Sequence, residues 1–248
     1  MRRFPWIDPA RAAAGLCRDF RVHREGRRLF WVREGWESCL PALKEALDGK
    51  TPHGASRIEG GRGGAFLWCR TDGESAVVRR LLRGGLFAPL LGDRHFGPTL
   101  RPVRELSDLE RLASLSVPVP EGVGAALEFL GRFAYRGVVA TRRIPRGQNL
   151  RDFLCAESDP QRRRAACAGA VRALCALERA GAVHPDLHLG NFVVDPEKPE
   201  RVWIVDCDRL RWSRFGRRRV WRRVRDSVRK LDPLGRRVSP EWFARGAA

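Results

Sequence analysis

The first half of the chain consists mainly of short apolar runs that are separated by turns rich in glycine, proline and polar residues. Runs of this length and composition predict β-strands, and the turns between them reverse the chain. Apolar residues recur at three- and four-residue spacing in two further segments, which predicts helices there. The predicted strands are residues 20–23, 28–32, 65–69, 74–81, 125–130 and 135–141, and the predicted helices are residues 36–47 and 101–114.

The second half predicts a helical region that contains one short hairpin. Residues 160–180 are rich in alanine, leucine and cysteine, and Gly181 follows where a glycine commonly ends a helix. Two apolar runs, Phe192–Asp195 and Val202–Val205, flank a turn that contains two prolines. These runs predict an antiparallel pair of strands.

The hairpin should bring together two polar residues that lie at its ends. Asn191 precedes the first strand, and Asp206 follows the second strand fifteen residues later. Because an antiparallel hairpin returns the chain to its starting end, we expect the two side chains to lie next to each other. An amide oxygen and a carboxylate are ligands of the kind that Mg²⁺ takes in phosphoryl-transfer sites.

The segment His184-Pro-Asp-Leu-His-Leu-Gly-Asn191 leads into this hairpin. It follows the pattern H-x-D-L-x-x-x-N of a kinase catalytic loop, in which the aspartate accepts the proton of the attacking hydroxyl. His184 and Asp186 are therefore the candidate catalytic residues. An H-x-D triplet alone is a weak signal, but its combination with the hairpin and Asp206 is specific.

Glycines gather immediately before the predicted strand 65–69. Glycine lets a backbone approach phosphate oxygens closely, so this segment is a candidate phosphate-covering loop, although glycine-rich turns are common. The candidate nucleotide-binding glycines are Gly60, Gly61, Gly63 and Gly64.

Arg79 lies near the end of the next strand, where a kinase carries the lysine that holds the ATP phosphates. Its guanidinium is always charged and grips phosphate in a forked geometry that differs from that of lysine. Glu105, on the predicted helix 101–114, is the expected partner of this cation, and Glu110 is the competing candidate. A solvated surface carboxylate is the other interpretation of Glu105.

Together these patterns predict an α+β fold with two lobes, like that of protein kinases. Residues 1–141 would form a β-rich N-terminal lobe with an N-terminal extension and the glycine-rich loop, residues 142–149 the hinge, and residues 150–248 a short helical C-terminal lobe. ATP and Mg²⁺ are the expected cofactors. Only 42 residues follow Asp206 in the 248-residue sequence, so we expect a small or glycolipid acceptor in place of a protein.

Composition indicates a preference for anionic partners. The chain has 48 lysine and arginine residues against 29 acidic ones, a formal net charge of +19. The low lysine content fits a G+C-rich genome, but this bias does not explain why residues 209–237 contain thirteen basic and two acidic residues. Such a segment favours the phosphates of nucleic acid, of an anionic membrane or of a phosphorylated glycolipid.

The remaining composition predicts a cytoplasmic protein. No apolar run is long enough for a transmembrane helix, and residues 1–9 lack the apolar stretch of a signal peptide. The seven cysteines are scattered and form no C-x-x-C pair, as expected for reduced thiols. Trp212 and Trp221 are candidates for contact with a lipid interface, whereas Trp203 is expected in the core.

Four segments together resemble the lipopolysaccharide kinase family, which includes 3-deoxy-D-manno-octulosonic acid (Kdo) kinase and the core heptose kinase. They are Arg80-Leu-Leu-Arg-Gly-Gly-Leu-Phe87, the helix from Arg101 through Glu105, the loop His184–Asn191, and Val205-Asp-Cys-Asp-Arg209. The first of these most resembles Kdo kinase, and the basic segment 222–231 also fits.

The resemblance implies a Gram-negative enzyme that lies peripherally on the cytoplasmic face of the inner membrane. Its partners would be the anionic membrane surface and a glycolipid substrate, and it would transfer the γ-phosphate of ATP to an inner-core sugar hydroxyl, most closely that of Kdo on a lipid A precursor. By the roles known in the family, Asp186 is the base, Asn191 and Asp206 bind Mg²⁺, Arg79 holds phosphate, and Glu105 pairs with Arg79.

Two positions depart from the kinase pattern or have no assigned role. His188 stands where Ser/Thr kinases carry a lysine, two residues after the candidate base. Asp208 is either a support for the metal site or a solvated loop residue.

Other functions stay open at this point. A core heptose kinase or another small-molecule kinase would use the same residues, although aminoglycoside-type phosphotransferases tend to have acidic acceptor pockets, unlike this basic chain. A RIO-type kinase that works near RNA would suit the charge. A pseudokinase that binds RNA or membrane is the non-enzymatic alternative, but such a protein need not keep Asp186, Asn191 and Asp206.

Overall fold

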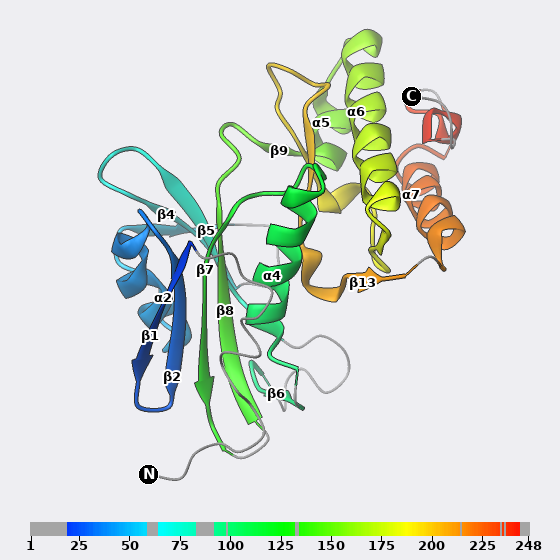
Figure 1. Cartoon of the computed structure of the whole chain (residues 1–248). Helices are drawn as coiled ribbons and strands as arrows, with labels where there is room; N and C mark the ends of the chain where they lie inside the picture. Colours follow the sequence, from blue (N-terminus) through cyan, green and yellow to red (C-terminus); the bar gives the residue numbers. More distant parts are fainter. Residues whose placement is uncertain are drawn as a thin grey trace. The chain divides into compact units, whose positions relative to one another are not determined.

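The computed structural model divides into two compact units, and one of the points at which the chain passes between them lies within the helix Arg101–Ser114, labelled α4 in Figure 1. Unit 1 comprises the described residues up to Glu110 together with Glu121–Arg143, and unit 2 comprises Arg111–Pro120 together with the described residues from Ile144 onward. The lobe and hinge limits expected from the sequence stay predictions. The structure describes residues 19–58, 64–82, 92–97, 99–131, 134–213, 215–233, 235 and 237–243.

Unit 1 is built on an antiparallel sheet whose strands follow the order β1-β2-β7-β8-β5-β4-β3, with β6 paired to β8. The strands that the turn-bounded apolar runs predict are all present, and two short ones, β3 and β6, are added. The strands are β1 (Phe20–Glu25), β2 (Arg28–Arg33), β3 (Ala55–Arg57), β4 (Ala65–Cys69), β5 (Ser75–Arg80), β6 (His95–Phe96), β7 (Gly122–Phe129) and β8 (Ala134–Arg142).

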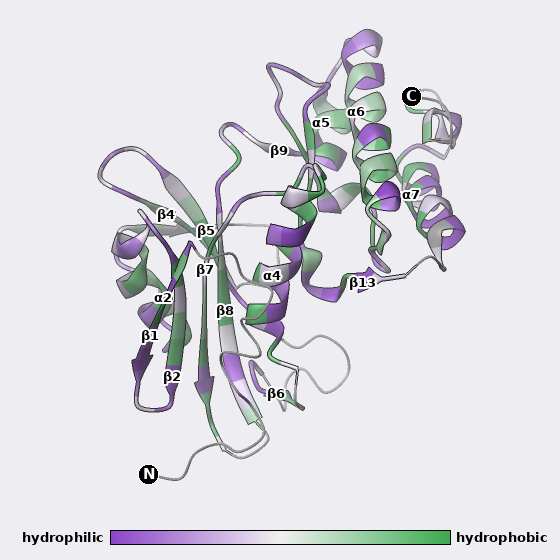
Figure 2. Cartoon of the chain, in the orientation of Figure 1, coloured by the Kyte–Doolittle hydropathy of each residue, from purple (hydrophilic) through white to green (hydrophobic). Residues whose placement is uncertain are grey.

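The central strands of the sheet are buried on both faces, because a helix covers each face (Figure 1), whereas the edge strands β1 and β3 are largely exposed. Successive residues of a strand point to opposite faces. In β2, Phe30 and Val32 accordingly pack on the side of α2 (Leu40–Leu47), and Leu29 and Trp31 pack on the side of α4 (Arg101–Ser114). Continuous apolar composition is expected for strands that are covered on both sides, and hydrophobic colouring predominates along β7 in Figure 2.

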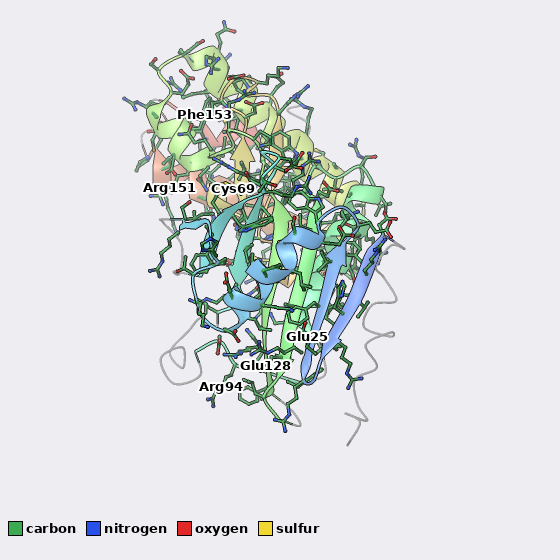
Figure 3. The ribbon with its side chains drawn as sticks, turned by 90° about the vertical axis from the view of Figure 1, so that its left-hand side faces the viewer. Glu25, Cys69, Arg94, Glu128, Arg151 and Phe153 are labelled. Carbon is green, nitrogen blue, oxygen red and sulfur yellow. The ribbon has the colours of Figure 1, made fainter. Side chains whose placement is uncertain are left out.

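Charged side chains form ion pairs at one end of this sheet. Figure 3 looks at the sheet from the side of α2 and shows Glu25 and Glu128 toward the same end. Glu128 accepts hydrogen bonds from Arg28 (Nε–Oε1 3.2 Å) and Arg136 (Nε–Oε2 2.6 Å), and Glu25 pairs with Lys44 of α2. These pairs join strands and a helix that are far apart in the sequence.

The N-terminal end of α4 is fixed against the sheet by polar contacts and by a missing side chain. The Tyr135 hydroxyl donates to the carbonyl of Thr99 (2.6 Å) and accepts from the backbone N–H of Arg101 (3.0 Å). A Cβ atom on Gly137 of β8 would lie 2.2 Å from Cγ of Pro102, the second residue of α4. Glycine at this position therefore sets how closely the helix approaches the strand.

The described part of unit 2 contains α-helices, short 3-10 helices, the last residues of α4 and the predicted hairpin. The α-helices are α5 (Leu150–Ala156), α6 (Pro160–Arg179) and α7 (Arg217–Leu231), and the strands are β9 (Gln148–Asn149), β10 (Ala182–Val183), β11 (Phe192–Val194), β12 (Val202–Ile204) and β13 (Arg211–Trp212). The β11–β12 pair is antiparallel, and β9 extends it on the β11 side. Gly169 allows α6 to approach the hairpin turn, since a Cβ there would lie 2.5 Å from the carbonyl oxygen of Glu200.

Local signals explain where the helices of unit 2 begin. Asn149 and Asp159 cap α5 and α6 by accepting hydrogen bonds from the N–H groups of Arg151 and Gln161. Pro160 occupies the first position of α6, where its missing N–H costs nothing. Figure 2 shows α6 as mainly hydrophobic with polar bands, as expected for a helix that packs on several neighbours.

The basic helix α7 buries an apolar stripe and packs on the short 3-10 helix Pro240–Phe243. Val220, Val224 and Val228 are buried, and the buried Trp221 donates from Nε1 to Oε2 of Glu178 on α6 (3.1 Å). The expectation that Trp221 contacts lipid is therefore wrong, because its ring fills the core of unit 2. In the described part of the chain, no helix is both long and apolar enough to cross a membrane.

We predict that Gly137→Ala destabilises unit 1 by about 1–3 kcal/mol, the usual cost of forcing an extra carbon into a packed core. The added Cβ would push α4 away from β8, which urea denaturation should report as a lower midpoint. Gly131→Ala is the matched control, because a Cβ there meets nothing within 4 Å. Equal midpoints for the two variants would show that α4 adjusts freely.

Candidate functional site

The loop between β10 and β11 carries the two candidate catalytic residues and is anchored by alternate side chains. Leu187 and Leu189 are buried, whereas Asp186 and His188 are exposed. The Asp186 side chain is 55% exposed, so its carboxylate is open to a substrate. The apolar residues of the loop therefore hold the backbone while the acidic side chain stays accessible.

His184 joins this loop to the end of the hairpin. Its buried ring places Nε2 2.9 Å from the backbone oxygen of Asp206. Since a carbonyl oxygen only accepts, Nε2 carries the hydrogen, and Nδ1 has no hydrogen-bond partner among the described residues. Burial lowers the pKa of His184, against the opposing influence of Asp206, so the imidazole is neutral near neutral pH.

Asp206 adopts a left-handed backbone conformation, with φ +61° and ψ +51°. Residues other than glycine rarely take this conformation, and it persists where surrounding contacts impose it. Here the N–H of Val205 donates to the carbonyl of Asn191 (2.9 Å), and His184 donates to Asp206 itself. The turn redirects the chain directly after the hairpin, and the short 3-10 helix Cys207–Arg209, which contains the half-buried Asp208, follows it.

Asn191 and His188 cap the 3-10 turn that ends the loop. The Oδ1 atom of Asn191 accepts from the N–H of His188 (3.1 Å), and Nδ1 of His188 accepts from the N–H of Gly190 (3.0 Å). Asn149 of β9 adds a hydrogen bond from Nδ2 to the carbonyl of Gly190 (2.8 Å). His188, whose role the sequence left open, thus stabilises the loop.

The side-chain oxygens of Asn191 and Asp206 are of the kind that binds Mg²⁺. The backbone of Asn191 is hydrogen-bonded to Val205, the residue directly before Asp206. The Oδ1 atom of Asn191 accepts one hydrogen bond from His188 and keeps a second lone pair. Mg²⁺ commonly takes only one or two protein oxygens and completes its shell with water and substrate phosphates. The described residues contain no group of three or more histidine, cysteine or acidic side chains that could hold a metal by themselves.

Arg223 of α7 reaches the same loop, which the sequence did not reveal. Its Nη1 atom donates to Oδ1 of Asp186 at 2.7 Å. Four residues further along α7, Oγ of Ser227 accepts from the N–H of Leu189 (3.2 Å). Residues four apart lie on one face of a helix, so the spacing of Arg223 and Ser227 is the only local signal of this contact.

In unit 1, Arg79 of β5 and Glu105 of α4 form an ion pair, with Nη2 and Oε1 2.5 Å apart. Glu105 is only 3% exposed, which excludes the interpretation as a solvated surface carboxylate. The competing residue, Glu110, pairs with Arg33 of β2 instead. Arg80 donates to the carbonyl of Gly49 (3.2 Å), away from Glu105.

Most of the candidate glycine-rich loop lies outside the described residues, namely Gly60, Gly61 and Gly63. Gly64 is described, and its carbonyl accepts from the N–H of Arg80 at 2.7 Å. A Cβ on Gly64 would lie 3.0 Å from Cδ1 of Leu82 and 3.3 Å from the carbonyl oxygen of Arg80, so a larger residue would require its neighbours to shift slightly.

Comparison with known proteins connects these features to one family. The family model described as "Lipopolysaccharide kinase (Kdo/WaaP) family" matches residues 55–246. A 3-deoxy-D-manno-octulosonic acid kinase of Xylella fastidiosa is 30% identical over 190 residues, covering 75% of this chain and 72% of its own. The kinase of the same name from Vibrio parahaemolyticus is 24% identical over 200 residues, covering 78% and 80%.

Among solved structures, WaaP in complex with acyl carrier protein is similar in fold. The TM-score is 0.53 at 17% identity, and the match covers 87% of this chain and 82% of that one. This similarity, together with the large antiparallel sheet and the helices of unit 2, confirms the predicted α+β, kinase-like fold class.

We predict that acid destabilises the protein in part through His184. Its folded-state pKa lies below the ordinary value of 6.5, so the unfolded chain binds the proton more readily. The stabilisation is complete above that value and is lost as the pH falls toward the folded-state pKa. Between about pH 7.5 and about pH 5.5, the urea midpoint should fall further for the wild type than for His184→Asn, which removes this titrating ring.

His53→Asn is the matched control, because it removes a ring from an exposed position. This control should show the wild-type decrease. Equal decreases for the wild type and His184→Asn would mean that neutral His184 does not contribute to the pH dependence.

Proposed function

Because this chain belongs to the lipopolysaccharide kinase (Kdo/WaaP) family, we propose that it transfers the γ-phosphate of ATP to a sugar hydroxyl of the lipopolysaccharide inner core. Family membership makes the chain a phosphotransferase. It also favours a lipopolysaccharide kinase over the aminoglycoside-type, RIO-type and non-catalytic alternatives. The relatives from Xylella fastidiosa and Vibrio parahaemolyticus are named as Kdo kinases and favour Kdo on a lipid A precursor as the acceptor. A core heptose acceptor is the alternative within the family.

The observation that carries the proposal is the loop in which an exposed Asp186 precedes the paired ends Asn191 and Asp206. Asp186 would accept the proton of the sugar hydroxyl as its oxygen bonds to the γ-phosphorus and the bond between phosphorus and ADP breaks. His184 supports this loop through Asp206, since its ring spans the two segments and does not reach solvent. It is therefore a positioning residue.

Mg²⁺ and ATP would be held by residues that the family resemblance assigns. Asn191 and Asp206 offer two oxygens to Mg²⁺, which would neutralise phosphate charge when bound. Arg79 would contact the ATP phosphates, and the buried Glu105 supports this role, because a carboxylate paired on one side of the guanidinium fixes its direction. Gly60, Gly61, Gly63 and Gly64 would cover the phosphates.

The outer side of α7 supports a location on an anionic membrane surface, the inner membrane of a Gram-negative cell. We define the basic surface as the exposed Arg218, Arg219 and Arg222 of α7. Phe215, which is 86% exposed, lies just before the start of the helix. Arginines beside an exposed aromatic ring combine attraction to anionic headgroups with an apolar contact, and no membrane span is needed.

We predict that Asp186→Asn lowers kcat by about 10²–10⁴-fold, the usual contribution of a general base. Transfer from labelled ATP to a Kdo-containing lipid A precursor measures the loss, and circular dichroism checks the fold. Asp226→Asn, an exposed carboxylate of α7 that pairs with Arg229, is the control and should keep its activity. Normal turnover by Asp186→Asn would refute the assignment of the base.

We predict that replacing the basic surface weakens binding to anionic vesicles. The triple variant Arg218→Gln/Arg219→Gln/Arg222→Gln should bind vesicles with phosphatidylglycerol about 100-fold less tightly at low salt, since each arginine contributes about 1 kcal/mol near such a surface. Sedimentation with the vesicles measures the binding. The control variant Arg151→Gln/Arg179→Gln/Arg201→Gln removes three exposed charges elsewhere in unit 2. Equal losses in both variants would indicate an effect of net charge alone.

A further inference from the structure

The ion pair between Arg223 and Asp186 lies on an open part of unit 2. The side chains are 40% and 55% exposed, and Nη1 of Arg223 contacts only the Oδ1 oxygen of the carboxylate. Among the described residues, none hydrogen-bonds to Asp186 Oδ2 or to the other nitrogens of Arg223. Both side chains therefore keep groups with which to bind a ligand.

The position of Arg223 is fixed by two other contacts of α7. Ser227 accepts from the N–H of Leu189 in the catalytic loop, and Trp221 donates to the buried Glu178 of α6. These contacts flank Arg223 on the same helix, two residues before it and four residues after it. A guanidinium that is held beside a base in this way loses little conformational freedom on binding a ligand.

His188 does not supply a cation beside the base. It occupies the position where Ser/Thr kinases carry a lysine, but its Nδ1 accepts from the N–H of Gly190 and caps the loop. Arg223 supplies the positive charge from a distant helix, and its planar, forked guanidinium suits a carboxylate better than an ammonium group does.

We propose that Arg223 determines acceptor specificity by binding the carboxylate of an acidic sugar while Asp186 Oδ2 receives the proton of a hydroxyl elsewhere on the same sugar. The inference rests on the proposed function and deepens it, because the proposed acceptor, 3-deoxy-D-manno-octulosonic acid, carries a carboxylate next to its ring. The free nitrogens of Arg223 would form a bidentate pair with this group, and the contact to Asp186 would keep the base and the acceptor anion in one fixed arrangement.

The test compares the Kdo-containing lipid A precursor with the same acceptor after its sugar carboxylate is converted to the methyl ester. For the wild type, the ester should raise KM roughly ten- to hundredfold, the effect of losing hydrogen bonds to a charged group. Arg223→Gln should raise KM for the acid by a similar factor and should no longer distinguish acid from ester. Arg223→Lys, which keeps the charge without the fork, should recover part of the discrimination.

Arg229→Gln is the matched control, because it removes an arginine of the same helix that pairs with Asp226 and not with Asp186. It should keep the preference of the wild type. Discrimination by Arg223→Gln as strong as that of the wild type would overturn the inference, and so would a fall in kcat on both acceptors at unchanged KM, which would place Arg223 at the transferred phosphate. Failure of the wild type to phosphorylate the acid at all would overturn the proposed function as well.

Discussion

The candidate site depends on the antiparallel register of β11 and β12. Phe192 faces Ile204 in this pairing, so the backbone of Asn191 meets that of Val205, and Asp206 begins the left-handed turn immediately afterward. A slip of one residue would reverse the faces of every side chain in the strand and separate the two oxygen donors. The ring of His184 then joins the loop to this hairpin through the carbonyl of Asp206.

Helix α7 has three faces with different roles, which the basic composition of its sequence did not distinguish. Its apolar stripe, Val220, Val224 and Val228, is buried within unit 2, and Trp221 hydrogen-bonds to α6. A second face meets the loop His184–Asn191 through Arg223 and Ser227, and a third exposes arginines. An amphipathic helix can satisfy all three because its periodicity distributes neighbouring residues over different faces. High charge in this segment is therefore compatible with burial and with a specific contact to Asp186.

The two-sided core of unit 1 explains how a carboxylate comes to lie beside Arg79. The sheet packs α2 on one face and α4 on the other, and glycine at position 137 permits the close approach of α4. Glu105 is carried inward on that helix and is almost fully buried. A buried carboxylate needs a cation, and Arg79 provides it. The ion pair is thus a consequence of helix packing as much as of the two residue types.

The sequence by itself determined the elements and pairings whose signals are local. Turn chemistry and apolar runs located the hairpin, helical periodicity located α2 and α4, composition located α6, and the fifteen-residue spacing placed the backbone of Asn191 opposite the end of the second strand. Only the tertiary structure decided that Arg223 contacts Asp186 across 37 residues, that Trp221 is buried and that His188 caps its own loop. Such contacts depend on how helices pack in three dimensions, and the periodicity of one segment carries no information about its distant partner.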